Sequence, residues 1–211
     1  MEKNYPSSSK VVVIGGGVIG CSVAYHLTKF GWRDVTLLER DQLTSGTTWH
    51  AAGLVSQLGP TAAVTKIRKY TLDLYKKLEK EVDHSAGLRL NGALSIAQTN
   101  SRWQELKRQA TTAQLYDVDI DILDSDTIKK RYPMMHTEDL KGGVLMSGDG
   151  AADPSGVTHM LAKAARKGGA KIFEQSPVEK ILIKNKRVHG VKVNGQIIEC
   201  EYIVLATRYV V

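Results

Sequence analysis

The sequence predicts an α/β protein with a doubly wound parallel sheet, and three observations support this fold class. Residues 11–14 form a short apolar run, typical of a buried parallel strand, which ends abruptly in glycines. Residues 18–30 have the composition of a helix, and a second apolar strand follows at residues 35–39. Together the three segments make one βαβ unit, whose crossover is right-handed by rule.

Three glycines between the first strand and the first helix, Gly15, Gly17 and Gly20, have the G-x-G-x-x-G spacing. Gly15 permits the tight turn, Gly17 removes a side chain that would block a pyrophosphate, and Gly20 lets the helix pack onto the strand. The free N–H groups and the positive end of the helix dipole then favour phosphates. Glu39, about twenty residues further on, suits the ribose hydroxyls. The pattern predicts a dinucleotide site; a glycine turn in another α/β protein is the alternative.

Composition and charge are those of an ordinary globular protein and do not favour a nucleic-acid-binding or membrane-spanning one. The 211 residues are 42% hydrophobic and 24% charged, which is ordinary for a globular protein. The net charge is +7, but the basic residues are interleaved with acidic and apolar ones, which favours solvated helix faces over a nucleic-acid site. No apolar run is long enough to span a membrane. Cys21 and Cys200 are expected to be buried free thiols in a reducing compartment.

The loop at residues 40–54 follows Glu39 directly and is rich in Ser, Thr and Gly. We expect it to open into a short helix, with Ser45 or Thr47 as the cap, near the phosphate and sugar end of a dinucleotide. His50 lies at the centre of the loop, beside a tryptophan. On chemistry alone, a packed and hydrogen-bonded histidine explains this position as well as a functional one.

The middle of the chain mixes helices and strands. Apolar residues at three- and four-residue spacing predict an amphipathic helix over residues 61–82. Two short strands, or one strand with a kink, are expected at residues 88–97. The further expected elements are a helix at 101–116 capped by Ser101 with Gln104, a strand at 119–123, a helix at 125–132 and a strand at 142–146.

The last third of the chain returns to the βαβ pattern. Pro154 starts a helix over residues 154–167, which stops at two glycines. Asp149 and Asp153 precede this helix, and two carboxylates without calcium-loop spacing favour turn and cap roles over a metal site. The expected strands are 171–174, then 177–183, 187–193 and 196–199 as a small antiparallel meander, and finally 202–206.

These elements divide the chain into parts. Residues 1–10 are predicted to be a disordered lead-in, without the apolar core of a secretory signal or the Arg-rich character of an organelle presequence. Residues 11–60 and 146–211 are expected to form the first half of a dinucleotide-binding domain. Residues 61–145 are expected to form a mixed α+β lobe, inserted on the substrate side.

With these motifs in view, the chain resembles the FAD-dependent amine oxidoreductases related to glycine and sarcosine oxidases. Within that family it looks most like the branch of sarcosine and dimethylglycine dehydrogenases. The resemblance extends from Val11 to Ala206, and its most specific part is the Thr-Trp-His-Ala-Ala-Gly stretch. The motifs are IGGGVIG with VTLLER, LTSGTTWHAAGL, NGALSIA, GDGAADPSG and the meander after SPVEKI.

The resemblance implies that the cofactor is FAD. In that family, the histidine at the position of His50 is bonded covalently to the 8α carbon of the flavin ring, a bond that a neutral imidazole nitrogen can form. Val178 would hold the adenine ring through backbone contacts. The implied FAD contacts are Gly15, Gly17, Val18, Ile19, Gly20, Glu39, Arg40, Gly46, Thr47, Thr48, Trp49, His50, Ala51, Ala52, Gly53, Leu54 and Val178.

The reaction implied by the resemblance is oxidative N-demethylation of a small methylated amino acid such as sarcosine or dimethylglycine. A hydride would pass from the N-methyl carbon to the flavin, and the resulting iminium would be hydrolysed or captured by tetrahydrofolate. An electron-transferring flavoprotein would then accept the electrons. No catalytic base is assigned, and no metal, nucleic acid or membrane partner is expected. Eukaryotic relatives are mitochondrial matrix proteins, which makes the matrix the expected location and the cytoplasm the alternative.

Two departures from the family pattern bear on activity. The strand at residues 202–206 normally continues into a glycine turn before an aromatic residue, but here Thr207 is followed by Arg208 and Tyr209. The rest of the substrate lobe, the returning flavin strand and the folate-binding region are also absent from this sequence. We therefore expect a fragment or truncated form that is inactive, with tetrahydrofolate bound only by the absent region.

Two other functions stay open. The pyruvate dehydrogenase phosphatase regulatory subunit resembles the same family without being an amine dehydrogenase, but it lacks the Trp-His pair that this chain keeps at Trp49 and His50. An NAD-dependent dehydrogenase would explain the glycines, but not the TTWHAAG stretch or the long insertion. Flavin fluorescence that survives denaturation of the protein would separate the three.

Overall fold

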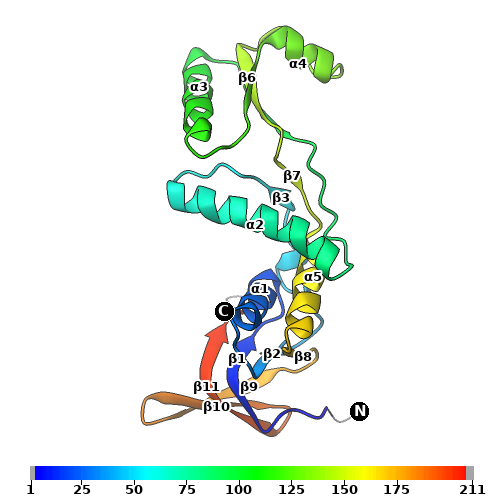
Figure 1. Ribbon diagram of the computed structural model, residues 1–211, viewed down its shortest axis with the longest axis vertical. Coiled ribbons are helices and arrows are strands. Elements are labelled where there is room, and N and C mark those ends of the chain that lie inside the picture. Colours follow the sequence, from blue (N-terminus) through cyan, green and yellow to red (C-terminus); the bar gives the residue numbers. More distant parts are fainter. Residues whose placement is uncertain (1–2, 208–211) are drawn as a thin grey trace. The chain divides into compact units, whose positions relative to one another are not determined.

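A computed structural model describes residues 3–207 of the chain (Figure 1). The chain divides into two compact units. The first unit comprises Met1–Ala52, Lys77–Gly87 and Asp153–Val211, and the second comprises Gly53–Lys76 and Leu88–Ala152. Arg208 and Tyr209, on which the predicted loss of a glycine turn rests, lie outside the described residues.

The first unit contains a six-stranded mixed sheet with two helices and one short 3-10 helix. The strands are β1 (Ser8–Ile14), β2 (Val35–Leu38), β8 (Lys171–Phe173), β9 (Val178–Lys184), β10 (Arg187–Val193) and β11 (Gln196–Leu205). The helices are α1 (Val18–Lys29), η1 (Thr48–His50) and α5 (Pro154–Lys167). The strands are ordered β8-β2-β1-β11-β10-β9; the first four are parallel, and β10 and β9 continue the sheet antiparallel. The predicted α/β fold class is therefore confirmed, with the meander joined to the parallel sheet.

β11 corrects the prediction of two separate strands at residues 196–199 and 202–206. Its residues from Gln196 to Glu199 pair antiparallel with β10, and the same strand then continues to Leu205 in parallel pairing with β1. Because Glu199 takes part in both pairings, no break in the strand is needed where its neighbour changes. The strand thus carries the chain from the meander into the parallel sheet.

β1 is buried on both faces of the sheet. Val12 belongs to a core that includes Val191 and Ile198 from the meander side. Val11 and Val13 alternate with Val12 and therefore face the opposite side, where they too are buried. A strand buried on both faces has no polar alternation, which explains why the sequence of β1 is a continuous apolar run.

The prediction that residues 1–10 form a disordered lead-in is wrong for the described residues of that segment. β1 begins at Ser8, and the ring of Tyr5 is buried against that of Phe173, with 5.0 Å between the ring centroids. The Tyr5 hydroxyl lies 2.8 Å from Oγ of Ser176, which is 171 positions away in the sequence. Local sequence signals could not reveal burial that depends on so distant a partner.

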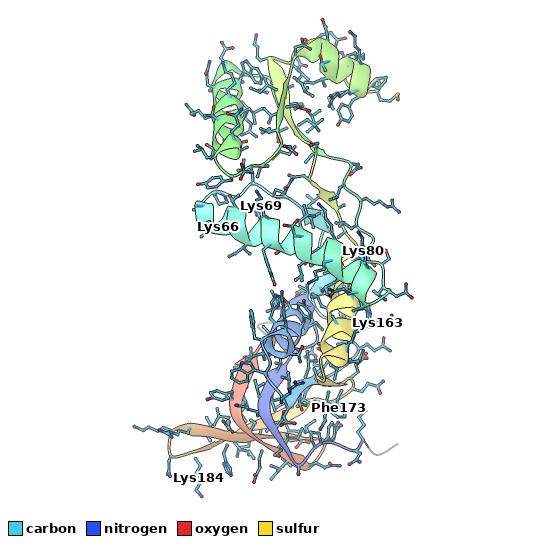
Figure 2. The ribbon with its side chains drawn as sticks, viewed as in Figure 1. Lys66, Lys69, Lys80, Lys163, Phe173 and Lys184 are labelled. Carbon is cyan, nitrogen blue, oxygen red and sulfur yellow. The ribbon has the colours of Figure 1, made fainter. Side chains whose placement is uncertain are left out.

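The segment 77–87 is bound to α5 within the first unit. Lys163, labelled in Figure 2, donates from Nζ to the carbonyl oxygen of Asp83 at 2.9 Å, and Lys167 donates to that of Glu81 at 3.0 Å. The Ala86 carbonyl accepts from the backbone N–H at position 153 at 2.7 Å. These bonds fix the C-terminal end of α2 (Ala62–Glu81) to the helix that follows the second unit.

The second unit contains two small antiparallel sheets, residues 62–76 of α2, and two further helices. Its strands are β3 (Leu54–Val55), β4 (Ala93–Ala97), β5 (Asp121–Leu123), β6 (Gly142–Met146) and β7 (Gly150–Ala151), and its helices are α3 (Asn100–Gln114) and α4 (Ser125–Arg131). β6 lies between β4 and β5, and buried residues of α3 and α4, such as Leu106 and Ile128, pack against this sheet. β3 pairs with β7, a short strand that the sequence did not predict. Within residues 3–207, none of the helices has both the length and the apolar character needed to cross a membrane.

The predicted helix caps are partly confirmed. Asp153 caps α5 as expected, and its carboxylate accepts from the Gly156 N–H at 2.9 Å. The cap of α3 is Thr99 rather than the predicted Ser101, so this helix begins one residue earlier than expected. Thr and Ser are both good caps, so the residue types alone do not distinguish Thr99 from Ser101.

Asp149 is almost fully buried in the second unit, at 1% exposure. Its Oδ1 accepts from the Gln57 N–H at 2.8 Å, while its Oδ2 has no hydrogen-bond partner among the described residues. Burial raises the pKa of Asp149 above its usual value, against the lowering effect of the Gln57 hydrogen bond. Asp149 is therefore part of a turn, as predicted, but its carboxyl group is buried where a negative charge is unfavourable.

Asp149→Asn is expected to become more stabilising, relative to the unchanged chain, as the pH rises. A raised folded-state pKa favours folding while the carboxyl is protonated, and this contribution is lost as the pH rises from the unfolded pKa, about 3.9, through the folded one. Urea unfolding between about pH 4 and pH 8 measures the difference. Asp119→Asn, at an exposed position of the same unit, is the control. A pH-independent difference between Asp149→Asn and the unchanged chain would contradict the assignment.

Candidate dinucleotide site

A cavity of about 520 Å³ lies in the first unit, where β1, β2 and β11 end. The glycine turn, the loop after β2, the start of β9 and the residues after β11 form its walls. Ligands of open parallel sheets bind outside the carboxyl ends of the strands, which is where this cavity lies. Its lining residues are Ile14, Gly15, Gly16, Gly17, Leu38, Glu39, Arg40, Ser45, Gly46, Thr47, Thr48, Ser176, Pro177, Val178, Ala206 and Thr207.

The glycine turn leaves no room for side chains at its first and last glycines. Gly15 has a φ of +115°, and a Cβ there would lie 2.5 Å from the carbonyl oxygen of Ala206. A Cβ on Gly20 would lie 1.9 Å from the carbonyl oxygen of Gly15. Gly15 is thus required by the turn and its contact with the end of β11, and Gly20 by the close approach of α1 to the turn.

The N-terminus of α1 lies at the cavity wall. Gly17 is the N-cap of α1 and provides no side-chain hydrogen bond. Instead, the Val18 N–H donates to Oγ1 of Thr48 at 3.0 Å, and a Cβ on Gly17 would lie 2.9 Å from that oxygen. Thr48 is buried and supplies, from a distant loop, the acceptor that a helix N-terminus needs. The same helix end favours a phosphate in the adjoining cavity.

Glu39 fixes the turn from the end of β2. Its Oε2 accepts from the Gly16 N–H at 2.5 Å, and its Oε1 accepts from the Asp41 N–H at 2.9 Å. The carboxylate is partly exposed and lines the cavity. Because an ionised carboxylate can accept about four hydrogen bonds, Glu39 retains the capacity to bind hydroxyl groups. The prediction of Glu39 as a ribose ligand did not anticipate its bond to the glycine turn.

Trp49 and His50 form an exposed pair in η1. Their ring centroids are 3.7 Å apart, and Nδ1 of His50 lies 3.2 Å from the carbonyl oxygen of Gly46. A carbonyl can only accept, so Nδ1 is the donor in this contact, and in the neutral imidazole the lone pair then lies on Nε2. Thr47 is the N-cap of the short helix, one of the two residues expected there, but its side chain makes no capping hydrogen bond.

Cys21 and Cys200 are buried free thiols, as predicted. Burial raises the pKa of Cys21 to about 12 and that of Cys200 to about 11. Cys21 lies beneath the glycine turn, with Sγ 3.8 Å from the carbonyl oxygen of Gly16. Both thiols therefore stay protonated at neutral pH and are unsuited to nucleophilic roles.

The structure brings part of the predicted contact set to the cavity. The predicted residues that line it are Gly15, Gly17, Glu39, Arg40, Gly46, Thr47, Thr48 and Val178. Those that belong to the same unit without lining it are Val18, Ile19, Gly20, Trp49, His50, Ala51 and Ala52, whereas Gly53 and Leu54 belong to the second unit.

Sequence reasoning missed eight of the wall residues. They are Ile14, Gly16, Leu38, Ser45, Ser176, Pro177, Ala206 and Thr207. Gly16 could have been found inside the glycine run, and the residues after β11 could have been found from the rule that sites gather at the carboxyl ends of parallel strands. No local signal marks Ser176, which reaches the cavity through the pairing of β8 with β2.

The residues present fit a dinucleotide. The cavity volume lies within the range of small-molecule and cofactor sites, about 300–1,000 Å³. Its walls combine a side-chain-free turn and a helix N-terminus for the diphosphate with a carboxylate for the ribose.

Comparisons with known proteins identify the kind of dinucleotide. A model of the family described as "FAD dependent oxidoreductase" (DAO) matches residues 10–208. L-proline dehydrogenase from P. horikoshii has a similar structure, with a TM-score of 0.88 and 29% identity over 97% of this chain and 54% of that one. Glycine oxidase from Bacillus cereus has a TM-score of 0.79 and 28% identity, over 94% of this chain and 55% of that one. The family match indicates FAD.

Curated relatives extend the similarity to amine dehydrogenases. Human mitochondrial sarcosine dehydrogenase is 40% identical over 193 residues, 89% of this chain and 21% of that protein. Human mitochondrial dimethylglycine dehydrogenase is 37% identical over 84% of this chain and 20% of that protein. The mouse pyruvate dehydrogenase phosphatase regulatory subunit is 34% identical over 94% of this chain and 23% of that protein. This chain thus spans about a fifth of the length of these relatives.

Proposed function

Because this chain belongs to the FAD-dependent oxidoreductase family, we propose that it binds FAD for the oxidative demethylation of a small N-methylated amino acid such as sarcosine or dimethylglycine. The observation that carries the cofactor proposal is the cavity at the glycine turn. The substrate class rests on the similarity to sarcosine and dimethylglycine dehydrogenases. When bound, FAD supplies a ring that accepts a hydride from the N-methyl carbon of the substrate.

Each wall of the cavity has one part in holding the cofactor. The turn at Gly15 and Gly17, with the N-terminus of α1, receives the diphosphate. The Glu39 carboxylate accepts hydrogen bonds from the ribose of the adenosine, and Val178 contacts the adenine ring through its backbone. The loop of residues 45–48 closes the remaining side.

His50 is the residue that we propose to bond covalently to the flavin. The hydrogen bond from Nδ1 to the Gly46 carbonyl holds one tautomer, so Nε2 carries the free lone pair and is the nucleophilic nitrogen. His50 is exposed, as attack on an incoming ring requires. The ring of Trp49 lies beside the imidazole, with 3.7 Å between the ring centroids and 33° between the ring planes.

Partners and location follow from the proposed activity. We propose an electron-transferring flavoprotein as the electron acceptor and the mitochondrial matrix as the location, the latter because the sarcosine and dimethylglycine dehydrogenases in question are named as mitochondrial. Tetrahydrofolate capture of the one-carbon unit would require chain beyond the cavity described here.

A regulatory, non-catalytic role is the second candidate. It is favoured by the 34% identity to the pyruvate dehydrogenase phosphatase regulatory subunit over nearly the whole chain. Against it stands the exposed Trp49–His50 pair, to which the proposed covalent bond to flavin gives a role. A covalently bound flavin would decide for the enzyme.

Titration of the full chain with FAD and with ADP tests the cofactor proposal. Both are expected to bind, because ADP is the half of FAD that the cavity suits, and Glu39→Gln is expected to weaken both about tenfold through the weakened ribose contacts. Calorimetry gives the dissociation constants. Glu199→Gln, an exposed carboxylate elsewhere on the sheet, should bind as the unchanged chain does. Absence of binding at millimolar ligand would overturn the proposal.

A further inference from the structure

The loop after β2 is fixed by the segment that follows β8. The Glu39 N–H donates to the Phe173 carbonyl at 2.9 Å, and the Ser176 N–H donates to the Glu39 carbonyl at 2.7 Å. The Gln175 N–H donates to the Asp41 carbonyl at 2.6 Å. The parallel pairing of β2 with β8 therefore extends past both strands, up to the cavity wall.

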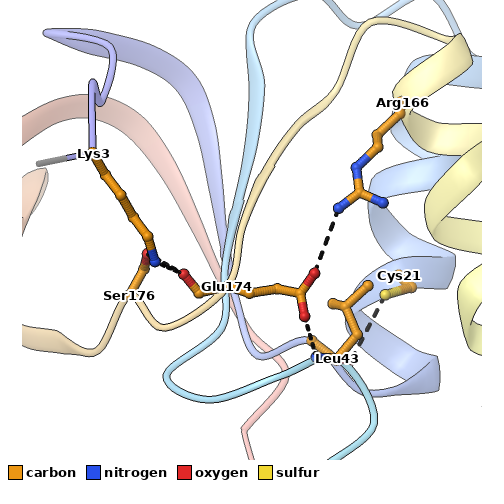
Figure 3. A network of polar contacts seen from close by, with 7 residues as sticks. Lys3, Cys21, Leu43, Arg166, Glu174 and Ser176 are labelled. Atoms are coloured by element: carbon orange, nitrogen blue, oxygen red, sulfur yellow. Dashed lines mark hydrogen bonds and ion pairs between the residues drawn. The ribbon is translucent and has the colours of Figure 1, made fainter. Parts of the chain in front are cut away.

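Glu174 adds a side-chain bond to this backbone pairing (Figure 3). Its Oε2 accepts from the Leu43 N–H at 3.0 Å, and its Oε1 lies 3.8 Å from Nη2 of Arg166 on α5. Its backbone carbonyl accepts from Nζ of Lys3 and from Oγ of Ser176. The Arg166 pair is long and its side chains are 47% and 36% exposed, so its contribution is small. The bond to Leu43 is charge-assisted and is the stronger of the two.

Leu43 connects this bond to the glycine turn. Its side chain is buried, and a Cβ on Gly16 would lie 2.7 Å from its Cδ2. The next residue, Thr44, donates from its N–H to the Gly16 carbonyl at 3.1 Å. Leu43 is thus the anchor in the middle of a loop whose two ends, at Arg40 and Ser45, line the cavity.

We propose that Glu174, which does not line the cavity, is a positioning residue for the adenosine end of FAD. By accepting from Leu43, it holds the loop of residues 40–45 in the form that completes the cavity before the cofactor arrives. The inference rests on the proposed FAD site and adds a residue that sets the affinity of that site.

Preorganisation is the physical basis of this role. Without the Glu174 bond, the loop samples other conformations, and cofactor binding must order it again. The apparent affinity for the cofactor is the intrinsic affinity multiplied by the fraction of molecules whose loop is in the binding form, so it falls as that fraction falls. A side-chain amide keeps an acceptor for the Leu43 N–H, whereas a methyl group does not.

The test compares variants of Glu174 and Arg166 in the full chain. Glu174→Ala is expected to weaken FAD and ADP binding about tenfold, the scale of one charge-assisted hydrogen bond, whereas Glu174→Gln keeps affinity within about threefold. Arg166→Gln is expected to change affinity less than Glu174→Ala does, because its ion pair is long and exposed. Calorimetry measures affinity, and hydrogen exchange reports the Leu43 amide, which should exchange faster only in Glu174→Ala.

Glu79→Ala is the matched control. Glu79 also accepts from a backbone N–H of the first unit, that of Ala86 at 2.7 Å, but it neither lines the cavity nor adjoins a residue that does. Its loss should cost similar thermal stability and leave cofactor affinity unchanged. The inference is overturned if Glu174→Ala binds FAD as the unchanged chain does, or if Glu174→Gln is as weak as Glu174→Ala. An unchanged chain that binds neither FAD nor ADP overturns the proposed function itself, and the inference with it.

Discussion

A Gly20→Ala variant is expected to lose dinucleotide binding and about 2–3 kcal/mol of the free energy of unfolding, the cost of overpacking a rigid site. A Cβ at position 20 would lie 1.9 Å from the carbonyl oxygen of Gly15, so α1 must move away from the turn. The clash is with backbone rather than with a flexible side chain, and no rotamer change can relieve it. Movement of α1 also carries its N-terminus away from the cavity wall.

Gly46→Ala is the control for this experiment. Gly46 also lines the cavity, but a Cβ there would have no atom within 4 Å. Urea unfolding should give the same stability for Gly46→Ala as for the unchanged chain and a lower one for Gly20→Ala, and calorimetry with ADP should show loss of binding in Gly20→Ala. A Gly20→Ala protein with unchanged stability and ADP affinity would show that the turn is looser than the structure indicates.

His50→Ala is expected to abolish covalent flavin while leaving the fold and ADP binding intact. The imidazole is exposed, and its contacts are the Trp49 ring and the Gly46 carbonyl, so its removal opens no cavity in the core. The chain is produced with FAD present, denatured and separated from free flavin. Flavin fluorescence that remains with the unchanged polypeptide, and is absent from His50→Ala, is the expected result.

His136→Ala serves as the control for the loss of a histidine. The side chain of His136 is 85% exposed in the second unit, and its removal should leave the flavin signal unchanged. Equal flavin retention by the unchanged chain and His50→Ala would assign the bond to another residue. If neither the unchanged chain nor His50→Ala retains flavin after denaturation, the predicted covalent bond is contradicted, and with it the main distinction between an amine dehydrogenase and a regulatory relative.

Elements with strong local signals were predicted well. The strand β1 was predicted from an apolar run that ends in glycines. The helix α5 was predicted from Asp153 and Pro154 at its start and two glycines at its end. Both signals come from residues only a few positions apart. The G-x-G-x-x-G spacing likewise indicated a site at the end of β1, and a cavity is found there. In each case the residues that mark the element lie within it or beside it, so the local sequence carries the signal.

By itself, then, the sequence determined the fold class and the family resemblance, and it predicted a dinucleotide site where the structure has a cavity. Only the tertiary structure decided that β11 is one strand with two pairing partners, that Tyr5 is buried, that Thr48 caps α1, and that Glu174 holds the loop beside the glycine turn. Each of these depends on hydrogen bonds or packing between segments far apart in the chain. Such contacts depend on which strands and loops come together in the folded sheet. A local pattern of residues does not show this, so these contacts could not be predicted from the sequence.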